Sequence, residues 1–247
     1  MQVLQSLIAD RWVGQRAARG LHSAVNGRLV AQTHEEEPDF AESLTYARGT
    51  ALPALLQLDF QQRAARLKAL ANHLLERKEA LYAVSAHTGA TRADSWIDIE
   101  GGIGTLFAYA SIGRRELPSS NVVHEGPAVP LGKEGHFIGT HILAPRRGVA
   151  VHINAFNFPM WGLLEKFAPS FLAGMPCIVK PATATSYVAE SCVRLMMESQ
   201  LLPPGALQLV IGGSGDLAAL ADTDGFVELP PGPAEFVRGY VARIYRW

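Results

Sequence analysis

The chain has 247 residues, a formal net charge of −1 and 18% charged residues, which is ordinary for a globular protein and gives no reason to expect a nucleic-acid partner. Its longest apolar runs, 148–153 and 167–175, are much shorter than the roughly 20 residues that cross a membrane, so no membrane partner is expected. The start of the chain lacks the features of a secretory leader, and the two cysteines, Cys177 and Cys192, fit a reducing compartment, so we expect a cytoplasmic protein.

The first half of the chain is predicted to be mainly helical after an irregular or hairpin-like start. The predicted helices cover 38–51, 59–88 and 94–116. Asp59 is a suitable N-cap for the second of them, and Gly89 is placed to end it. The apolar stripe of that helix comprises Phe60, Ala64, Leu67, Leu70, Ala71, Leu74 and Leu75. The third helix has an apolar face formed by Trp96, Ile99, Ile103, Phe107 and Ala110. We expect these helices to be packing elements.

An extended arm is predicted between the helices and the core. Residues 119–133 are rich in proline, glycine and polar side chains, which indicates a loop. Two β-like runs follow, 135–143 and 147–153, separated by a short break at Pro145. The chain is therefore expected to form an arm and then to enter the first core strand.

From residue 149 onward, strands and helices alternate. Strands are predicted over 149–153, 177–180 and 206–211, with helices over 161–172, 186–200 and from the glycine-rich turn at 212 to residue 220. Alternation of this kind indicates an α/β fold with a parallel, Rossmann-like sheet.

Two polar residues, Asn157 and Lys180, follow or end neighbouring predicted strands. Open parallel sheets bind ligands at the carboxyl ends of their strands, so both residues are expected to line one crevice. Taken alone, Asn157 before Phe-Pro fits a turn residue or a helix N-cap, and Lys180 fits a solvated lysine at the end of a strand. The functional alternative is that Asn157 donates a hydrogen bond to an oxyanion and Lys180 binds the ribose or a phosphate of a dinucleotide.

The residues that decide between these interpretations lie in two segments. Segment 151–182 reads VHINAFNFPMWGLLEKFAPSFLAGMPCIVKPA, with an N-F-P turn and a V-K-P strand end, and segment 85–117 reads SAHTGATRADSWIDIEGGIGTLFAYASIGRREL. Over about 1–221, the chain resembles the aldehyde dehydrogenase superfamily, and within it the semialdehyde dehydrogenases of phenylacetate degradation. The resemblance implies that Asn157 helps to form the oxyanion hole and that Lys180 contacts the adenosine ribose.

The resemblance also implies a nicotinamide cofactor and a set of residues that contact it. Those residues are Ile153, Ala155, Phe156, Lys180, Ala182, Thr183, Gly212 and Gly215. In the family, members that prefer NAD often carry a glutamate three residues after the lysine, where this chain has Thr183. Because a carboxylate would repel a 2′-phosphate and a threonine would not, we expect NADP rather than NAD, with NAD still possible. The arm is expected to contribute to a homo-oligomer in the parent enzyme.

Several other residues have a structural interpretation that we prefer. The turn at 212–215 lacks the G-x-G-x-x-G fingerprint and can be either a simple turn or a ligand contact. Gly101 and Gly102 lie in a helical pattern, where close packing explains them better than phosphate binding does. The eight histidines show no metal-binding spacing, and His152 is expected to be buried and hydrogen-bonded.

The chemistry of the resembled family needs a cysteine thiolate and a glutamate, and this sequence offers poor candidates for the thiolate. Cys177 lies in a core strand and Cys192 lies on an apolar helix face, so both are expected to be structural. The expected F-T-G-S segment is not found, and residues 222–247 depart from the family pattern. We expect 1–221 to hold the helices, the arm and a partial dinucleotide-binding domain, and 222–247 to be an atypical tail; an internal deletion and a frameshift fit that tail equally.

The sequence therefore predicts a fragment of an NAD(P)-dependent dehydrogenase that oxidises a CoA-linked aldehyde to the acid. The fragment is expected to be inactive by itself because the nucleophile is missing. The alternative function is a non-catalytic dinucleotide-binding or assembly protein. An unrelated Rossmann-like oxidoreductase is disfavoured because its glycine fingerprint is missing.

Overall fold

A computed structural model describes residues 2–212, 226–227 and 244–245, and its core is a five-stranded sheet. The strands are β1 (Ser6–Ile8), β2 (Arg11–Val13), β7 (Ala150–Ile153), β8 (Cys177–Lys180) and β9 (Leu207–Leu209), in the spatial order β2-β1-β9-β8-β7. β7, β8 and β9 are parallel, as predicted. β1 pairs antiparallel with both β2 and β9, which extends the sheet beyond the predicted three strands.

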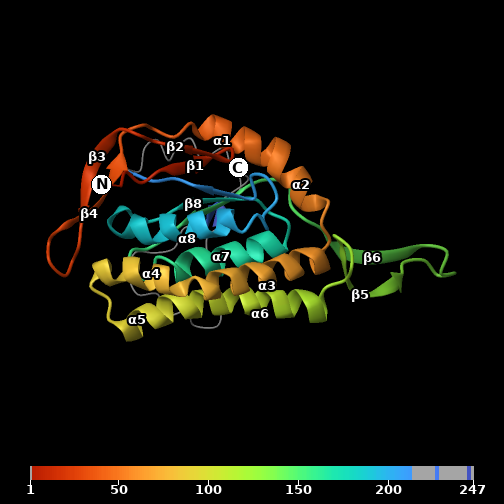
Figure 1. Cartoon of the computed structure of the whole chain (residues 1–247). Coiled ribbons are helices and arrows are strands. Elements are labelled where there is room, and N and C mark those ends of the chain that lie inside the picture. The colour runs from red at the N-terminus through yellow and green to blue at the C-terminus, as the bar shows by residue number, and fades with distance from the viewer. Residues whose placement is uncertain (1, 213–225, 228–243, 246–247) are drawn as a thin grey trace.

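Helices cover both faces of this sheet (Figure 1). On one face lie α7 (Trp161–Leu172) and α8 (Ser186–Glu198), and beneath them lie α3 (Phe60–Glu76), α4 (Lys78–Ser85), α5 (Arg92–Trp96) and α6 (Gly102–Glu116). The other face is covered by α1 (Phe40–Tyr46), which continues through η1 (Ala47–Ala51) into α2 (Leu52–Leu56). β8 is buried along its whole length: Cys177 and Val179 join the larger apolar core, and Ile178 joins a smaller core with Phe40 and Leu44 of α1.

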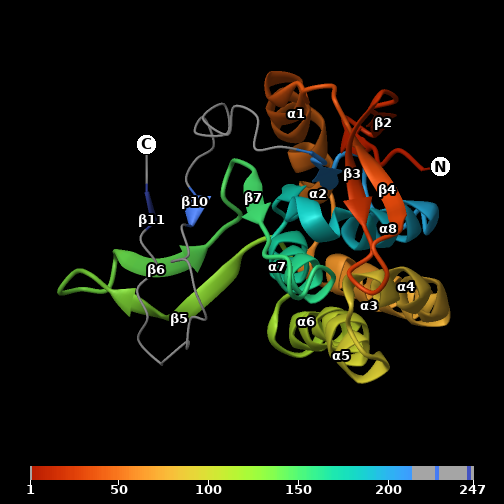
Figure 2. The ribbon, with the colours of Figure 1, turned by 90° about the vertical axis from the view of Figure 1, so that its left-hand side faces the viewer.

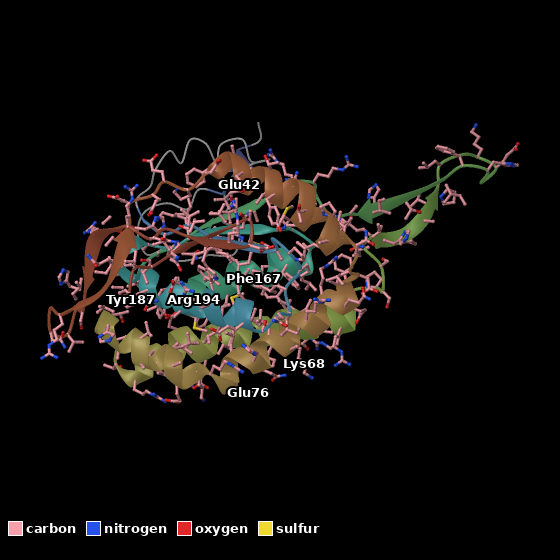
Figure 3. All side chains as sticks on the ribbon, turned by 45° about the horizontal axis from the view of Figure 1, so that its top comes forward. Glu42, Lys68, Glu76, Phe167, Tyr187 and Arg194 are labelled. Carbon is pink, nitrogen blue, oxygen red and sulfur yellow. The ribbon has the colours of Figure 1, made fainter. Side chains whose placement is uncertain are left out.

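Side chains follow this layering (Figure 3). Phe167 of α7 is fully buried between the sheet and the outer helices, whereas Lys68 and Glu76 of α3 lie on the outer surface. Trp161 of α7 is half-buried, and the apolar residues of the helix that are buried are Leu163, Leu164, Phe167, Ala168, Phe171 and Leu172.

The helical segment predicted over 59–88 begins after Asp59 and ends before Gly89, as predicted. α3 begins after Asp59, whose side chain accepts from the backbone N–H of Gln62, and the Gln62 side chain accepts from the Asp59 N–H in return. At the other end, η2 (Ala86–Thr88) is closed by Gly89 with φ +88°. A single continuous helix is nevertheless wrong, because Arg77 leaves helical geometry with φ −111° and separates α3 from α4.

The third predicted helix contains a π-helical turn, η3 (Ile97–Gly101), between α5 and α6. Ile99, Ile103 and Ala110 are buried as predicted. Trp96 is 57% exposed, which contradicts its predicted place on the apolar face. A π turn accommodates an extra residue, so it rotates the positions before it away from the stripe that follows.

The arm is a β-hairpin formed by β5 (Val123–Pro130) and β6 (Ile138–Leu143), and it projects from the body of the protein (Figure 2). The prediction of an arm is confirmed, but the prediction of a loop over 119–133 is wrong across β5. β5 is exposed along nearly all of its length, so it lacks the alternation of buried and exposed residues that reveals most strands. A second hairpin, β3 (Ala17–His22) with β4 (Leu29–His34), lies beside the N-terminal strands.

Near the end of the chain, β10 (Phe226–Val227) pairs antiparallel with β11 (Ile244–Tyr245). The helix predicted up to residue 220, the domain boundary predicted at residue 221 and Gly215 lie outside the described residues. Among the residues that are described, no helix is long and apolar enough to cross a membrane.

Candidate functional site: the carboxyl ends of β7 and β8

The carboxyl ends of β7 and β8 lie next to each other in register. Ile153 pairs with Lys180, and the backbone N–H of Asn154 donates to the Lys180 carbonyl over 3.0 Å. Asn157 follows in the turn that leaves β7. Asn157 and Lys180 therefore belong to the same end of two neighbouring parallel strands, which is where sheets of this kind hold ligands.

The turn that carries Asn157 is exposed. Ile153 is 59% exposed, Phe156 is 65% exposed, and Ala155 and Asn157 are also exposed. The turn is tied to the following segment by Thr185, whose hydroxyl donates to the Phe156 carbonyl over 3.1 Å. Asn157 is therefore exposed to solvent, on a turn whose preceding residue is held by a hydrogen bond.

Asn157 does not cap the helix that follows, contrary to one of its two simple interpretations. The N-cap residue of α7 is Met160, whose thioether is a weak acceptor. The cap comes instead from Asp98 of η3, whose Oδ1 accepts from the backbone N–H groups of Trp161 over 2.7 Å and of Met160 over 3.1 Å. Asp98 is 4% exposed, and burial raises its pKa to about 6 although these two bonds oppose the shift. The sequence contained no local signal for this bond.

Gly101 and Gly102 pack against the same helix start. A Cβ atom on Gly101 would lie 2.3 Å from the ring of Trp161, and one on Gly102 would lie 3.0 Å from the Trp161 Cα. The predicted explanation, close helix packing, agrees with this geometry.

Lys180 is buried, which contradicts the simple interpretation of a solvated lysine. Only 8% of the residue is exposed, and its Nζ donates to the Pro181 carbonyl over 2.9 Å. Burial lowers the pKa of Lys180. Within the described part of the chain, Lys180 has no carboxylate partner, so an ammonium group here would be stabilised by an anionic ligand.

Thr183 and Gly212 are brought together beside Lys180. The Thr183 hydroxyl donates to the Gly212 carbonyl over 3.0 Å and joins η4 (Thr183–Thr185) to the end of the β9 segment. Gly212 has φ +107°, a conformation that favours glycine. Ala182 and Thr183 are half-buried. Four of the predicted cofactor residues, Lys180, Ala182, Thr183 and Gly212, thus form one edge, with Ile153, Ala155 and Phe156 on the neighbouring strand and turn.

Both cysteines are poor nucleophiles. Cys177 and Cys192 are fully buried, and burial raises the pKa of Cys177 to about 12 and that of Cys192 further still. Because the thiolate is the reactive form, neither side chain is suited to attack a carbonyl group. The prediction that both are structural fits their burial.

Two buried polar residues lie on or just after β7. His152 is 7% exposed, and its Nε2 lies 3.1 Å from the Ser170 hydroxyl, so the predicted buried and hydrogen-bonded histidine is confirmed. Burial lowers the pKa of His152 to about 4. Asn154, which the sequence analysis did not single out, is 4% exposed, and neither polar atom of its side chain has a partner among the described residues.

Two cavities formed by described residues lie away from this site. One, of about 410 Å³, is lined by Lys68, Phe107, Ala110, Ser111, Arg114 and Arg115, and a second, of about 330 Å³, lies between α4 and α5. Neither is lined by a predicted site residue. Among the residues described, no group of three histidine, cysteine, aspartate or glutamate side chains could hold a metal ion.

Comparison with known proteins decides the family. Residues 12–227 match the sequence model of the aldehyde dehydrogenase family. The chain belongs to the aldehyde dehydrogenase family. It is 39% identical over 216 residues to 3,4-dehydroadipyl-CoA semialdehyde dehydrogenase from Aromatoleum evansii, an alignment that covers 87% of this chain and 42% of that protein. It is 30% identical over 223 residues to N-succinylglutamate 5-semialdehyde dehydrogenase from Shigella dysenteriae, with 87% and 43% covered.

Solved structures share the fold. A point mutant of betaine aldehyde dehydrogenase from Staphylococcus aureus, solved with NAD+, matches with a TM-score of 0.72 at 21% identity, over 87% of this chain and 42% of that one. An NADP-dependent enzyme from E. coli matches with a TM-score of 0.68 at 21% identity, with 87% and 43% covered. The chain thus spans about two fifths of the length of the relatives it matches, and it corresponds to their N-terminal portion. The predicted family and fold class are confirmed, and the alternative of an unrelated Rossmann-like oxidoreductase is excluded.

Proposed function

We propose that this chain is the cofactor-binding portion of an NAD(P)-dependent semialdehyde dehydrogenase. The observation that carries the proposal is the placement of the exposed Asn157 turn and of the buried Lys180, which has no carboxylate partner among the described residues, at the same end of β7 and β8. A bound NAD(P) supplies the hydride acceptor. The chain's own residues bind the dinucleotide and donate a hydrogen bond to the oxygen of the aldehyde.

Asn157 is the proposed oxyanion donor. Its side-chain amide donates a hydrogen bond to the aldehyde oxygen as that oxygen gains negative charge during thiolate attack. A fixed donor of this kind contributes roughly 10²- to 10³-fold to the rate. The bond from Thr185 to the Phe156 carbonyl supports this role, because it restrains the backbone immediately before Asn157.

Lys180, Thr183 and Gly212 are proposed to hold the adenosine side of the cofactor, with Ile153, Ala155, Phe156, Ala182 and Gly215 as further contacts. The hydroxyl hydrogen of Thr183 is used by Gly212, so Thr183 can only accept from a ribose hydroxyl. The positive charge for a 2′-phosphate must then come from Lys180, which the described part of the chain leaves without a counter-ion. An acceptor at Thr183 fits the ribose hydroxyl of NAD as well, so our proposal that NADP is preferred to NAD rests on the charge of Lys180.

The proposed substrate is a CoA-linked semialdehyde, oxidised to the acid in phenylacetate degradation. The relative from Aromatoleum evansii, which is 39% identical, is named for a CoA-linked semialdehyde and supports this choice. The nucleophilic thiol is proposed to come from the part of the parent enzyme that this chain does not cover, because Cys177 and Cys192 are buried and protonated. The chain alone is therefore expected to bind dinucleotide without oxidising aldehydes.

The arm is proposed to mediate self-association in the parent enzyme. Six large apolar residues of the hairpin are more than half exposed: Val129, Leu131, Phe137, Ile138, Ile142 and Leu143. An exposed apolar surface of this kind is typical of a protein interface. The same surface supports the second candidate function, an assembly protein that binds a full-length relative through the arm.

The test combines a titration with NADP, followed by tryptophan fluorescence, and an assay of aldehyde-dependent NADPH formation. The proposal predicts saturable binding without turnover, and turnover by this chain would contradict it. Absence of both binding and turnover would contradict the proposed cofactor site. It would indicate that the chain is a decayed gene product. The assembly function additionally predicts that the chain purifies together with a full-length relative expressed in the same cells.

A further inference from the structure

The turn that carries Asn157 leads directly into α7, and the start of α7 has no effective cap of its own. The first N–H groups of any helix lack partners within the helix. At α7 the N-cap residue is Met160, which is a weak acceptor, and Pro159 precedes it. The position of the Asn157 turn therefore depends on what binds these N–H groups.

Asp98 binds them from a different helix. Its Oδ1 accepts from Trp161 N–H over 2.7 Å and from Met160 N–H over 3.1 Å, and the residue is buried. A carboxylate at a helix N-terminus is favoured both by these bonds and by the helix dipole. The bonds link residues 62 and 63 positions apart in the chain, so they fix α7 relative to the outer helical layer.

The segment around Asp98 is shaped to reach α7. Asp98 lies in the π-helical turn η3, and such turns are frequent at functional sites. Gly101, at the end of η3, and Gly102, at the start of α6, leave room for Trp161, because a Cβ atom on either would lie within 3.0 Å of it. The turn and the two glycines together let the carboxylate approach the helix start closely.

We infer that Asp98 is a positioning residue for Asn157. By capping α7 from a separate helix, it holds the start of that helix and hence the turn that presents the proposed oxyanion donor. The functional meaning of this role rests on the proposed function, but the coupling of Asp98 to the turn does not.

The test compares Asp98→Ala and Asp98→Asn with the wild-type chain and with Asp59→Ala. Asp59 is the matched control, because it also caps a helix, accepting from Gln62 N–H over 2.7 Å, but at the start of α3. The first readout is hydrogen exchange at the backbone amides of residues 160–162, of which Gly162 donates to the Phe158 carbonyl over 2.9 Å and so reports on the turn. We expect exchange there to increase by roughly tenfold or more in Asp98→Ala, including at Gly162, to which Asp98 is not hydrogen-bonded.

Asp98→Asn should recover part of the protection, because its amide oxygen can still accept from Trp161 N–H. This variant also serves if Asp98→Ala does not fold. Asp59→Ala should increase exchange at the start of α3 and leave 160–162 unchanged. Unchanged exchange at 160–162 in both Asp98 variants, or an equal increase in Asp59→Ala, would overturn the inference.

The second readout is the NADPH dissociation constant of the same variants. A severalfold weaker binding in Asp98→Ala, but not in Asp59→Ala, is expected if the turn also contacts the cofactor. If the wild-type chain does not bind NADPH, the proposed function fails, whereas the exchange measurement still decides the positioning role of Asp98.

Discussion

At the scale of single residues, burial decides which of the chemically interesting side chains are available for reaction. Lys180 and Cys177 lie in β8 and Cys192 lies in α8, and all three are buried. The consequences differ, because a buried thiol remains neutral and unreactive, whereas a buried ammonium without a carboxylate partner favours an anionic ligand. Burial therefore argues against Cys177 and Cys192 as nucleophiles, and it argues for Lys180 as a cofactor contact.

His152 provides a test of burial by pH. Its pKa in the folded protein is about 4, below the ordinary value of 6.5, because burial disfavours the charged form and Lys166 adds to the effect. Stability contributed by neutral His152 is therefore fully present above about pH 6.5 and is lost as the pH falls towards 4. Urea unfolding of wild type and of His152→Gln between pH 4 and 8 should show a steeper loss in wild type, by up to roughly 1.4 kcal/mol per pH unit. Parallel curves would contradict the assigned burial.

At the scale of elements, the contact between η3–α6 and α7 holds the start of the helix that follows the Asn157 turn, and Thr185 holds the turn itself through the Phe156 carbonyl. α7 contributes six buried apolar residues to the core, but its start is held by residues from another part of the chain: Asp98, Gly101 and Gly102. The site therefore depends on the outer helical layer as well as on the sheet.

Two glycine substitutions separate this contact from the general effect of glycine in a helix. In Gly101→Ala the new methyl group would lie 2.3 Å from the Trp161 ring, so the ring or α7 must shift, and we expect a loss of about 1–3 kcal/mol in the free energy of unfolding. Gly104→Ala is the control, because its methyl group would meet nothing within 4 Å. Alanine is the better helix former, so this variant should gain up to about 1 kcal/mol. Equal effects of the two substitutions in urea unfolding would argue against the packing role.

Features with local causes could be predicted from the sequence, and features with distant causes could not. Asp59 and Gly89 define the ends of α3 and η2 through bonds and backbone angles within a few residues, so the predicted limits were right. Asp98 caps a helix more than 60 residues away, and no pattern near Trp161 indicates its partner. Trp96 was misplaced because the π turn that follows it changes the helical phase. Strand β1 has three residues and pairs with β9 from the other end of the sequence, so its place in the sheet was not predictable.

At the scale of the whole molecule, two surfaces formed by the described residues are open. β7 is the last strand of the five-stranded sheet in the described part of the chain, and the hairpin arm extends from the body (Figure 2). A strand at a sheet edge can pair with another chain, and an apolar arm can pack against one. Both surfaces favour association, and the arm provides the more direct test.

We expect the double substitution Phe137→Glu with Ile142→Glu to reduce self-association. Both side chains are more than half exposed on the hairpin, at 68% and 54%, and charges there would have to be buried in an interface. Val25→Glu is the control, because Val25 is 67% exposed but lies on the β3–β4 hairpin. Sedimentation velocity should show a smaller species for the arm variant only. The same distribution of species for both variants would show that the arm is not the contact.

We propose that this chain retains the cofactor half of an aldehyde dehydrogenase site, with Lys180 as the cationic anchor of the cofactor phosphate, and lacks the reactive thiol. Calorimetric titration of NADPH into wild type, Lys180→Met and the exposed-surface control Lys68→Met tests it most directly. We predict saturable binding to wild type and Lys68→Met, and affinity weaker by roughly tenfold or more in Lys180→Met. Equal affinity for all three proteins, or no binding to wild type, would contradict the account.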